Sequence, residues 1–194
     1  MDPARYLPLL EVLFALEPKV FIIGGIAEDA LLNGTMTRDH WDIDMFVLRD
    51  DVPLRMQQLA ALGFPRNEVK HEALPGLPMV YEGGQGDLHV ELGPVDELNS
   101  GELSFVAPGL EGSMRVYLPE DTMLYPASEI DGAPIQTVSP LALFLLRAGL
   151  EATGALGPLE ERGVAMQKRL RDELLVGVPE DQLRPRLELL DTLN

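Results

Sequence analysis

Residues 21–48 read FIIGGIAEDALLNGTMTRDHWDIDMFVL, and this segment is the most informative part of the chain. The apolar run Val20–Ile23 predicts a short buried strand that stops at the pair Gly24-Gly25. Residues 26–33 have the apolar spacing of a short helix, and residues 43–48 form a second apolar run of strand length. The segment therefore predicts the order strand, glycine pair, helix, strand.

Composition and charge set limits on the class of protein. The chain has 194 residues, 46% of them hydrophobic, which is enough for one domain, or one domain with a helical annex. Its 32 acidic and 15 basic residues give a net charge of −17, and phosphate backbones are bound mainly through Lys and Arg. We therefore expect no nucleic-acid partner. The sequence contains no cysteine, which excludes disulfides, thiolate metal sites and cysteine nucleophiles.

The sequence contains no segment that predicts export or membrane insertion. The first residues lack a basic stretch followed by an unbroken apolar run, because Glu11 interrupts the only candidate. No apolar run approaches the ~20 residues of a transmembrane helix. We therefore expect a cytoplasmic protein without a membrane partner.

The rest of the chain changes character once, at Ser139-Pro140. Before it, helices are expected over residues 6–16 and 52–62, and a β-rich stretch extends to a hairpin that turns at Asp131-Gly132. Ser139 is a good helix N-cap with proline at the first helical position, and the tail is predicted to form three helices. Their expected ranges are 140–153, 158–176 and 180–193. The predicted fold class is α/β (α+β), with a mixed sheet flanked by helices and a C-terminal helical bundle.

Asp42 and Asp44 are the first candidates for chemistry. They are two residues apart at the start of a predicted strand, so both carboxylates project from one face while Ile43 and Met45 point into the core. Two adjacent carboxylates repel each other unless a cation lies between them, and Mg²⁺ prefers oxygen ligands. The alternative interpretation is a solvated strand edge.

A later strand supplies further candidates. In the stretch GDLHVEL, residues 86–92, the side chains of Asp87, His89 and Glu91 share one face. Beside the strand of Asp42 and Asp44, Asp87 would complete a cluster of three carboxylates. An ordinary exposed strand with a polar outer face is an equally acceptable interpretation.

Gly24-Gly25 is the third candidate element. Glycines after a strand let backbone N–H groups approach a phosphate closely, and the N-terminus of the following helix favours an anion. Such a pair is more often only a turn. The order of the glycine pair, the helix and Asp-x-Asp is much more specific than any of these features alone.

Together these residues resemble the DNA polymerase beta-type nucleotidyltransferase superfamily. Its signature is an apolar strand, Gly-Gly or Gly-Ser, a short helix, Asp-x-Asp and a third acidic residue on a later strand. Within it, the chain is similar to the small lincosamide and aminoglycoside nucleotidyltransferases. The residues that carry the likeness are Gly24-Gly25, Asp29-Ala30-Leu31-Leu32, Gly34, Thr37-Arg38, His40, Asp42-Ile43-Asp44 and Asp87-Leu88-His89. The chain departs from the pattern at Trp41, where a polar residue is more usual before the first Asp.

The resemblance implies a role for each matching residue. Gly24 and Gly25 would hold a nucleoside triphosphate, and Arg38 would contact a phosphate or pair with a neighbouring aspartate. Asp42, Asp44 and Asp87 would bind two Mg²⁺ ions. Glu91, four residues beyond Asp87 on the same face of the predicted strand, is a candidate general base or cation ligand, or faces water. His40 is expected to be a packing residue.

The resemblance also implies a domain plan, with a catalytic domain over residues 1–138 and a helical region over 139–194. The expected activity is transfer of a nucleoside monophosphate, AMP from ATP, to a hydroxyl of a small molecule such as an aminoglycoside or lincosamide antibiotic. Residues 71–131 contain twelve acidic residues and one basic residue, Arg115, which favours a cationic acceptor. The alternatives are a toxin-type enzyme that modifies tRNA or protein, and a nucleotide-binding module without turnover. The sequence allows a homodimer without specifying one.

Overall fold

The fold is organised around a mixed sheet whose two central strands, β2 (Asp42–Leu48) and β5 (Leu88–Glu97), run parallel. The structure is a computed structural model that describes residues 6–74, 77–109, 112–154 and 161–190. The parallel pair brings the start of β2 beside the first half of β5. Side chains from two distant parts of the sequence therefore share one face of the sheet.

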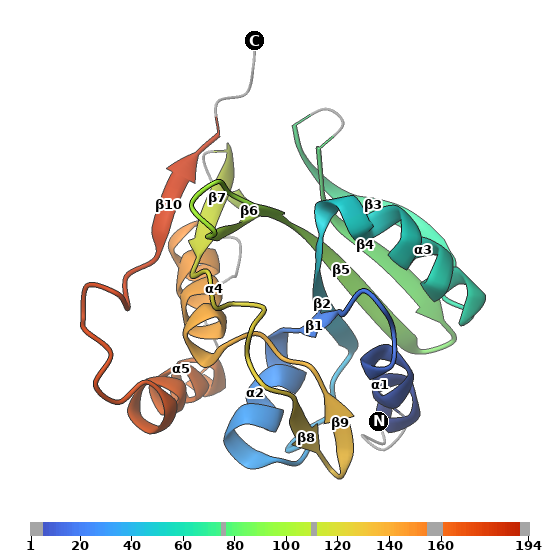
Figure 1. The fold of residues 1–194 in the computed structure, drawn as a ribbon, viewed down its shortest axis with the longest axis horizontal. Helices are drawn as coiled ribbons and strands as arrows, with labels where there is room; N and C mark the ends of the chain where they lie inside the picture. The colour runs from blue at the N-terminus through green and yellow to red at the C-terminus, as the bar shows by residue number, and fades with distance from the viewer. Residues whose placement is uncertain (1–5, 75–76, 110–111, 155–160, 191–194) are drawn as a thin grey trace.

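The other helices and strands surround this pair (Figure 1). They are α1 (Leu7–Phe14), β1 (Phe21–Ile22), α2 (Gly24–Asn33), α3 (Val52–Ala61), β3 (Arg66–Leu74), β4 (Leu77–Gln85), β6 (Leu103–Gly109), β7 (Gly112–Leu118), β8 (Ser128–Ile130), β9 (Ala133–Ile135), α4 (Pro140–Ala152), α5 (Glu161–Arg169) and β10 (Arg186–Leu189).

The main sheet branches at β5. Its strand order is β1-β2-β5-β6-β7-β10, and β4 also pairs with the first half of β5 and carries β3 on its other side. Except for the β2–β5 pair, the neighbours are antiparallel. Figure 1 shows the two branches diverging, with β3 and β4 behind α3 and with β6, β7 and β10 next to α4. β8 and β9 form a separate hairpin.

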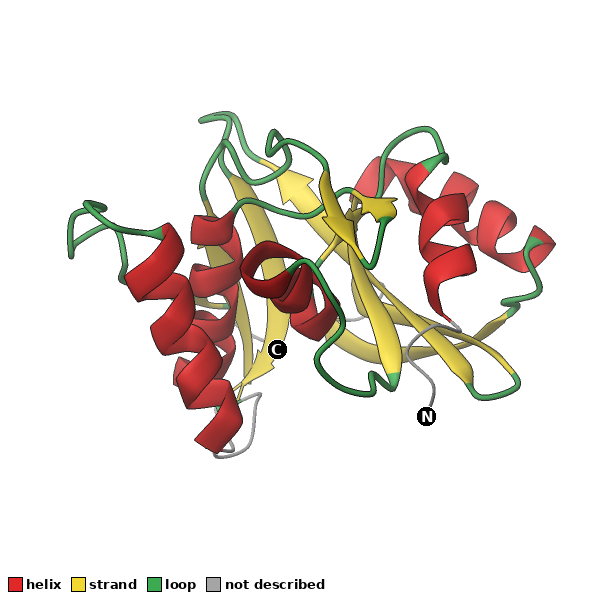
Figure 2. Cartoon of the chain, turned by 90° about the horizontal axis from the view of Figure 1, so that it is seen from below, coloured by secondary structure: helices red, strands yellow, loops and turns green. Residues whose placement is uncertain are grey.

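The core confirms the predicted alternation along β2. Ile43 and Met45 are fully buried, whereas Asp42 and Asp44 are half-buried on the opposite face. Helices flank the strands on either side in the view of Figure 2. The predicted α/β (α+β) class with a mixed sheet flanked by helices is confirmed. Among the described residues, no helix combines the length and the apolar character that a membrane span requires.

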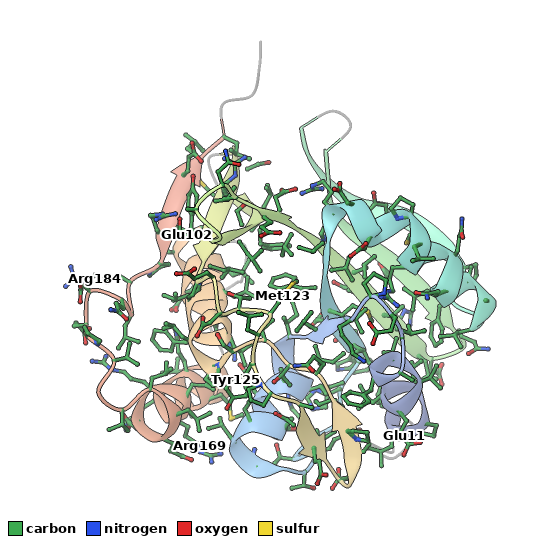
Figure 3. The ribbon with its side chains drawn as sticks, viewed as in Figure 1. Glu11, Glu102, Met123, Tyr125, Arg169 and Arg184 are labelled. Atoms are coloured by element: carbon green, nitrogen blue, oxygen red, sulfur yellow. The ribbon has the colours of Figure 1, made fainter. Side chains whose placement is uncertain are left out.

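The N-terminal end of α4 forms as the sequence predicts. The Ser139 hydroxyl accepts a hydrogen bond from the Ala142 N–H at 3.3 Å, and Pro140 is the first helical residue. Farther along, α5 continues into a π-helical segment, Leu170–Leu174. Arg169, labelled in Figure 3, joins this segment to the C-terminal end of α2 by donating to the carboxamide oxygen of Asn33 at 3.0 Å.

The prediction of a third tail helix over residues 180–193 is wrong. Residues 186–189 form β10, which pairs antiparallel with β7, and residues 191–193 lie outside the described residues. Pro185 explains the difference, because proline lacks an N–H and disfavours helix in the residue before it. The tail therefore contributes a strand to the sheet as well as two helices.

The proposed boundary at Ser139 lies within a continuous core. The cluster of buried hydrophobic residues includes Leu143 and Leu170 from the tail together with Val116 from β7 and Ile43 from β2. The first residues of the predicted helix 158–176, residues 158–160, lie outside the described residues. The sequence does not predict strand β3, because Arg66–Leu74 is rich in charged residues and has little apolar alternation.

Candidate active site

The start of β2 presents Asp42 and Asp44 on one face of the sheet. Register places Asp44 directly opposite Glu91 of β5, and Asp42 opposite His89. One carboxylate oxygen from each of Asp42, Asp44 and Glu91 lies within 4.8 Å of the others. We call these three half-buried residues the carboxylate triad. Three converging oxygen donors are a ligand set that suits Mg²⁺.

Asp87, the third ligand that the resemblance implies, lies outside this triad. It lies in the turn between β4 and β5 and is exposed. The physical reason is register: the partner of Asp44 is Glu91, four residues beyond Asp87. In the sequence pattern both acids fall on one face of the predicted strand, so alternation alone does not distinguish them. The structure thus brings together Asp42, Asp44 and Glu91, and not Asp87.

The first turn of α2 lies directly against the triad. The helix begins at Gly24, two residues before the predicted start, and its N-cap Ile23 donates a backbone hydrogen bond to the Asp44 carbonyl at 2.9 Å. Gly24 has φ +66°, and a Cβ there would overlap the Asp44 carboxylate. Glycine is thus needed both for the backbone angle and for the close approach. The N–H groups of a first turn have no partner within the helix and can bind an anion.

Gly25 has a different role in the same turn. A Cβ on Gly25 would overlap the guanidinium of Arg38 and would lie 2.9 Å from Cε1 of His40. The predicted phosphate contact, Arg38, therefore packs against the glycine pair. A cation and the N-terminus of a helix lie together beside three carboxylates.

Asp29 fixes the loop that carries Arg38. Its carboxylate accepts hydrogen bonds from the Thr37 N–H at 2.8 Å and the Thr37 hydroxyl at 2.6 Å, and it bonds to Nε2 of His40 at 3.0 Å. Burial raises the pKa of Asp29, but the bonds from His40 and Thr37 outweigh this and lower it to about 2. His40 is 5% exposed, as expected for a packing residue. Arg38 lies in the sequence between Thr37 and His40, which Asp29 anchors.

The β8–β9 hairpin fixes the start of the same loop. Asp131, which has φ +49°, accepts hydrogen bonds from the Thr35 hydroxyl and, at 2.9 Å, from the Met36 N–H. The bonds from Met36 and Thr35 lower the pKa of Asp131. The predicted turn at Asp131 forms, and the Asp131 carboxylate fixes the start of the loop that carries Arg38.

Sequence reasoning missed two acids near the triad. Glu28, on α2, is 3% exposed and forms an ion pair with Arg147 of α4. Glu82, on β4, lies opposite Glu91 in the antiparallel ladder, and its Oε1 is 3.6 Å from Nδ1 of His89. Glu82 could be identified only from strand register. Glu28 could be identified only from the docking of α4.

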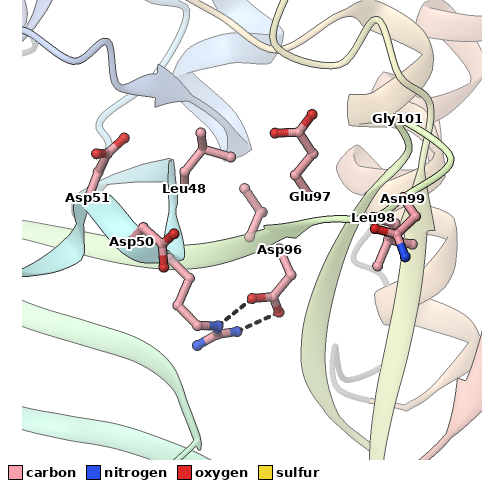
Figure 4. Close-up of a pocket in the computed structure, with 10 residues that line it drawn as sticks. Leu48, Asp50, Asp51, Asp96, Glu97, Leu98, Asn99 and Gly101 are labelled. Carbon is pink, nitrogen blue, oxygen red and sulfur yellow. Dashed lines mark hydrogen bonds and ion pairs between the residues drawn. The ribbon is translucent and has the colours of Figure 1, made fainter.

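A cavity of about 650 Å³ lies at the other end of β2 and β5 (Figure 4). Asp50, Asp51, Asp96 and Glu97 contribute to its wall, and Arg49 pairs with both oxygens of Asp96 at 2.5 and 2.9 Å. This cavity is separate from the triad, because it is lined by the C-terminal ends of the two strands.

Comparison with known proteins supports the fold. No protein-family model and no curated protein sequence matches the chain. Among solved structures, the chain is similar to the antibiotic-resistance factor ANT(2'')-Ia in solution, with TM-score 0.67, 18% identity, and coverage of 94% of this chain and 89% of that one.

Two crystal structures give the same result. Lincomycin-bound LnuA, a lincosamide antibiotic adenylyltransferase, has TM-score 0.59 and 17% identity, and the match covers 88% of this chain and 97% of that one. ANT(2'')-Ia in complex with adenylyl-2''-tobramycin has TM-score 0.58 and 18% identity, covering 84% and 82%. The chain therefore shares its fold with these enzymes, over nearly its whole length.

Proposed function

We propose that the protein is a Mg²⁺-dependent nucleotidyltransferase that transfers AMP from ATP to a hydroxyl group of a small molecule. The observation that carries this proposal is the carboxylate triad against the first turn of α2, where Arg38 also lies. The triad offers oxygen ligands for a divalent cation, and the helix turn and Arg38 offer donors for phosphates. Both occur in a fold shared with antibiotic nucleotidyltransferases.

The chain's residues divide the chemistry between them. Asp42 and Asp44 would hold Mg²⁺ with Glu91 as the third ligand, and the bound metal would polarise the phosphates and lower the pKa of the acceptor hydroxyl. The first turn of α2 and Arg38 would bind and orient the triphosphate. A carboxylate of the triad accepts the hydroxyl proton, and we assign this role to Glu91.

The reaction follows from that arrangement. The acceptor oxygen forms a bond to the α-phosphorus of ATP, while the bond from that phosphorus to the bridging oxygen of the β-phosphate breaks. Pyrophosphate leaves with the electron pair of the broken bond. The products are the adenylylated acceptor and pyrophosphate, and the hydroxyl proton ends on Glu91 before release to water.

We further propose an acceptor that carries amines, of the aminoglycoside kind, in preference to an uncharged one. The net charge of −17 and the twelve acids of residues 71–131 support this choice, because an acidic surface attracts cations. Glu82 extends the acidic face of the sheet beyond Glu91. The first acceptors to test are lincomycin, which is bound in one of the similar structures, and tobramycin, whose adenylyl-2'' form is bound in another.

The test is transfer of label from α-³²P-ATP to a panel of hydroxylated small molecules that includes tobramycin and lincomycin, with pyrophosphate release measured in parallel. The proposal predicts Mg²⁺-dependent labelling of an acceptor with one pyrophosphate per adenylyl group, abolished by Asp42→Asn. Binding of ATP without transfer to any acceptor would favour a nucleotide-binding module. Labelling of tRNA or protein in place of small molecules would favour a toxin-type enzyme.

A further inference from the structure

Glu28 is a buried acid that the proposed chemistry leaves without a role. It lies in the second turn of α2, four residues after Gly24 and three after Gly25, so all three share one face of the helix. Helical side chains tilt toward the N-terminus of their helix, which directs the Glu28 carboxylate toward the glycine pair. Its exposed fraction is 3%.

The partner of Glu28 comes from the C-terminal region of the chain. Nη1 of Arg147, on α4, donates to Oε1 of Glu28, and the Arg147 side chain is 21% exposed. Burial raises the pKa of Glu28, and attraction from Arg147 and then Arg38 opposes that rise. A buried acid of this kind is costly unless it is paired. The ion pair thus holds one end of the Arg147 guanidinium in place, while part of that side chain stays accessible to solvent.

A second arginine lies beside the same turn. The Arg38 guanidinium packs against Gly25, and its loop is anchored through Asp29. Arg147 therefore pairs with Glu28, while Arg38 packs one turn earlier on the same helix, close enough to attract the Glu28 carboxylate. Both guanidinium groups bring positive charge to the glycine-pair end of α2, in a chain of net charge −17.

We propose that Glu28 is a positioning residue, which holds Arg147 beside Arg38 so that both guanidinium groups are in place for the triphosphate of an incoming nucleotide. This inference rests on the proposed function. A long arginine side chain loses considerable rotamer freedom when it binds a phosphate, and a partner that fixes it beforehand removes part of that cost. Glu28 acts entirely through Arg147 and does not touch the nucleotide.

The test is calorimetric binding of α,β-methylene-ATP and of inorganic tripolyphosphate, both with Mg²⁺, to the full chain. We expect Glu28→Met to weaken the binding of both ligands by roughly tenfold, because the lost contact is to the phosphates, which both ligands contain. Glu28→Gln keeps an oxygen acceptor for Arg147 and should recover most of the affinity. Once Arg147→Met is present, adding Glu28→Met should cause no further loss.

The double variant is the control for a loss of folding in the single variants. Replacing both members of a buried ion pair with apolar residues is commonly neutral for stability, so Glu28→Met/Arg147→Met should fold even if one single variant does not. It is expected to bind both ligands about tenfold more weakly than the wild type. Melting temperatures identify which variants are folded.

Three outcomes would overturn the inference. Glu28→Met or the double variant could bind both ligands as tightly as the wild type. The losses from the two single substitutions could multiply in the double variant, which would mean that Glu28 does not act through Arg147. Failure of the wild type to bind either ligand would overturn the proposed function and this inference together, so the two failures are distinguishable.

Discussion

The third ligand position gives the sharpest prediction, because the sequence favoured Asp87 whereas strand register selects Glu91. We compare Glu91→Gln with the matched variant Asp87→Asn. Glu91 lies within 4.8 Å of both Asp42 and Asp44. At that separation one pair of like charges repels by ~0.9 kcal/mol in water and ~3.5 kcal/mol at an effective dielectric constant of ~20.

The lower figure is more appropriate, because the three carboxylates are half-buried and screened by solvent. Removing the Glu91 charge eliminates two such repulsions, which stabilises the metal-free protein by about 2 kcal/mol. For a chain of this size that raises the melting temperature in EDTA by roughly 4–8 °C. The same substitution should remove most of the stabilisation that Mg²⁺ gives the wild type, and should slow AMP transfer by about 10²–10⁴-fold.

Asp87→Asn should behave differently on every measure. Its side chain is exposed in a turn, so the free energy of unfolding should change by less than about 0.5 kcal/mol. The Mg²⁺ response and the transfer rate should stay near those of the wild type. The assays are thermal unfolding with EDTA or MgCl₂ and the labelled-AMP assay. If Asp87→Asn lost the Mg²⁺ response while Glu91→Gln kept it, the register argument would be refuted.

Three further predictions concern the surroundings of the triad. Gly25→Ala should weaken the binding of α,β-methylene-ATP by about tenfold in calorimetry, because the added methyl displaces the side chains packed against Gly25. The control is Gly34→Ala, at φ +66° with open space around it, which should cost about 1 kcal/mol of stability and leave the affinity intact. Equal affinities of the two variants would contradict this prediction. Asp29 has a pKa lowered to about 2, so the ionised carboxylate contributes about 2 kcal/mol to the free energy of unfolding above pH 4, and this contribution is lost as the pH falls toward 2. The stability difference between the wild type and Asp29→Asn in urea unfolding should therefore shrink between pH 4 and pH 2. A difference that stays constant would exclude this stabilising role of Asp29. Trp41, the single tryptophan, is 74% exposed beside Asp42, so nucleotide binding with Mg²⁺ should shift its fluorescence; unchanged emission during binding that calorimetry detects would place the ligand elsewhere.

The parts of the fold that sequence predicts correctly depend on local patterns. The alternation along Asp42–Leu48 and the N-cap at Ser139 each involve residues a few positions apart, and the structure confirms both. The error at residues 180–193 was also local, because Pro185 was available as a signal against a helix. Leu187 and Leu189 alternate with charged residues, which is the period of the strand that forms there.

The candidate site was predictable only in part, because its remaining members are assembled by tertiary contacts. Asp87 and Glu91 are equivalent in the sequence pattern, and the pairing of Asp44 with Glu91 separates them. Glu28 looks like an ordinary helical acid until α4 brings Arg147 against it. No local property of residues 26–33 indicates that partner.

The most direct test of the central claim is a crystal structure with α,β-methylene-ATP and with Mn²⁺ in place of Mg²⁺, in which an anomalous difference map locates the manganese. The account predicts an anomalous peak coordinated by Asp42, Asp44 and Glu91, with the triphosphate against the first turn of α2 beside Arg38. Nucleotide bound elsewhere, or manganese held by Asp87 in place of Glu91, would contradict it.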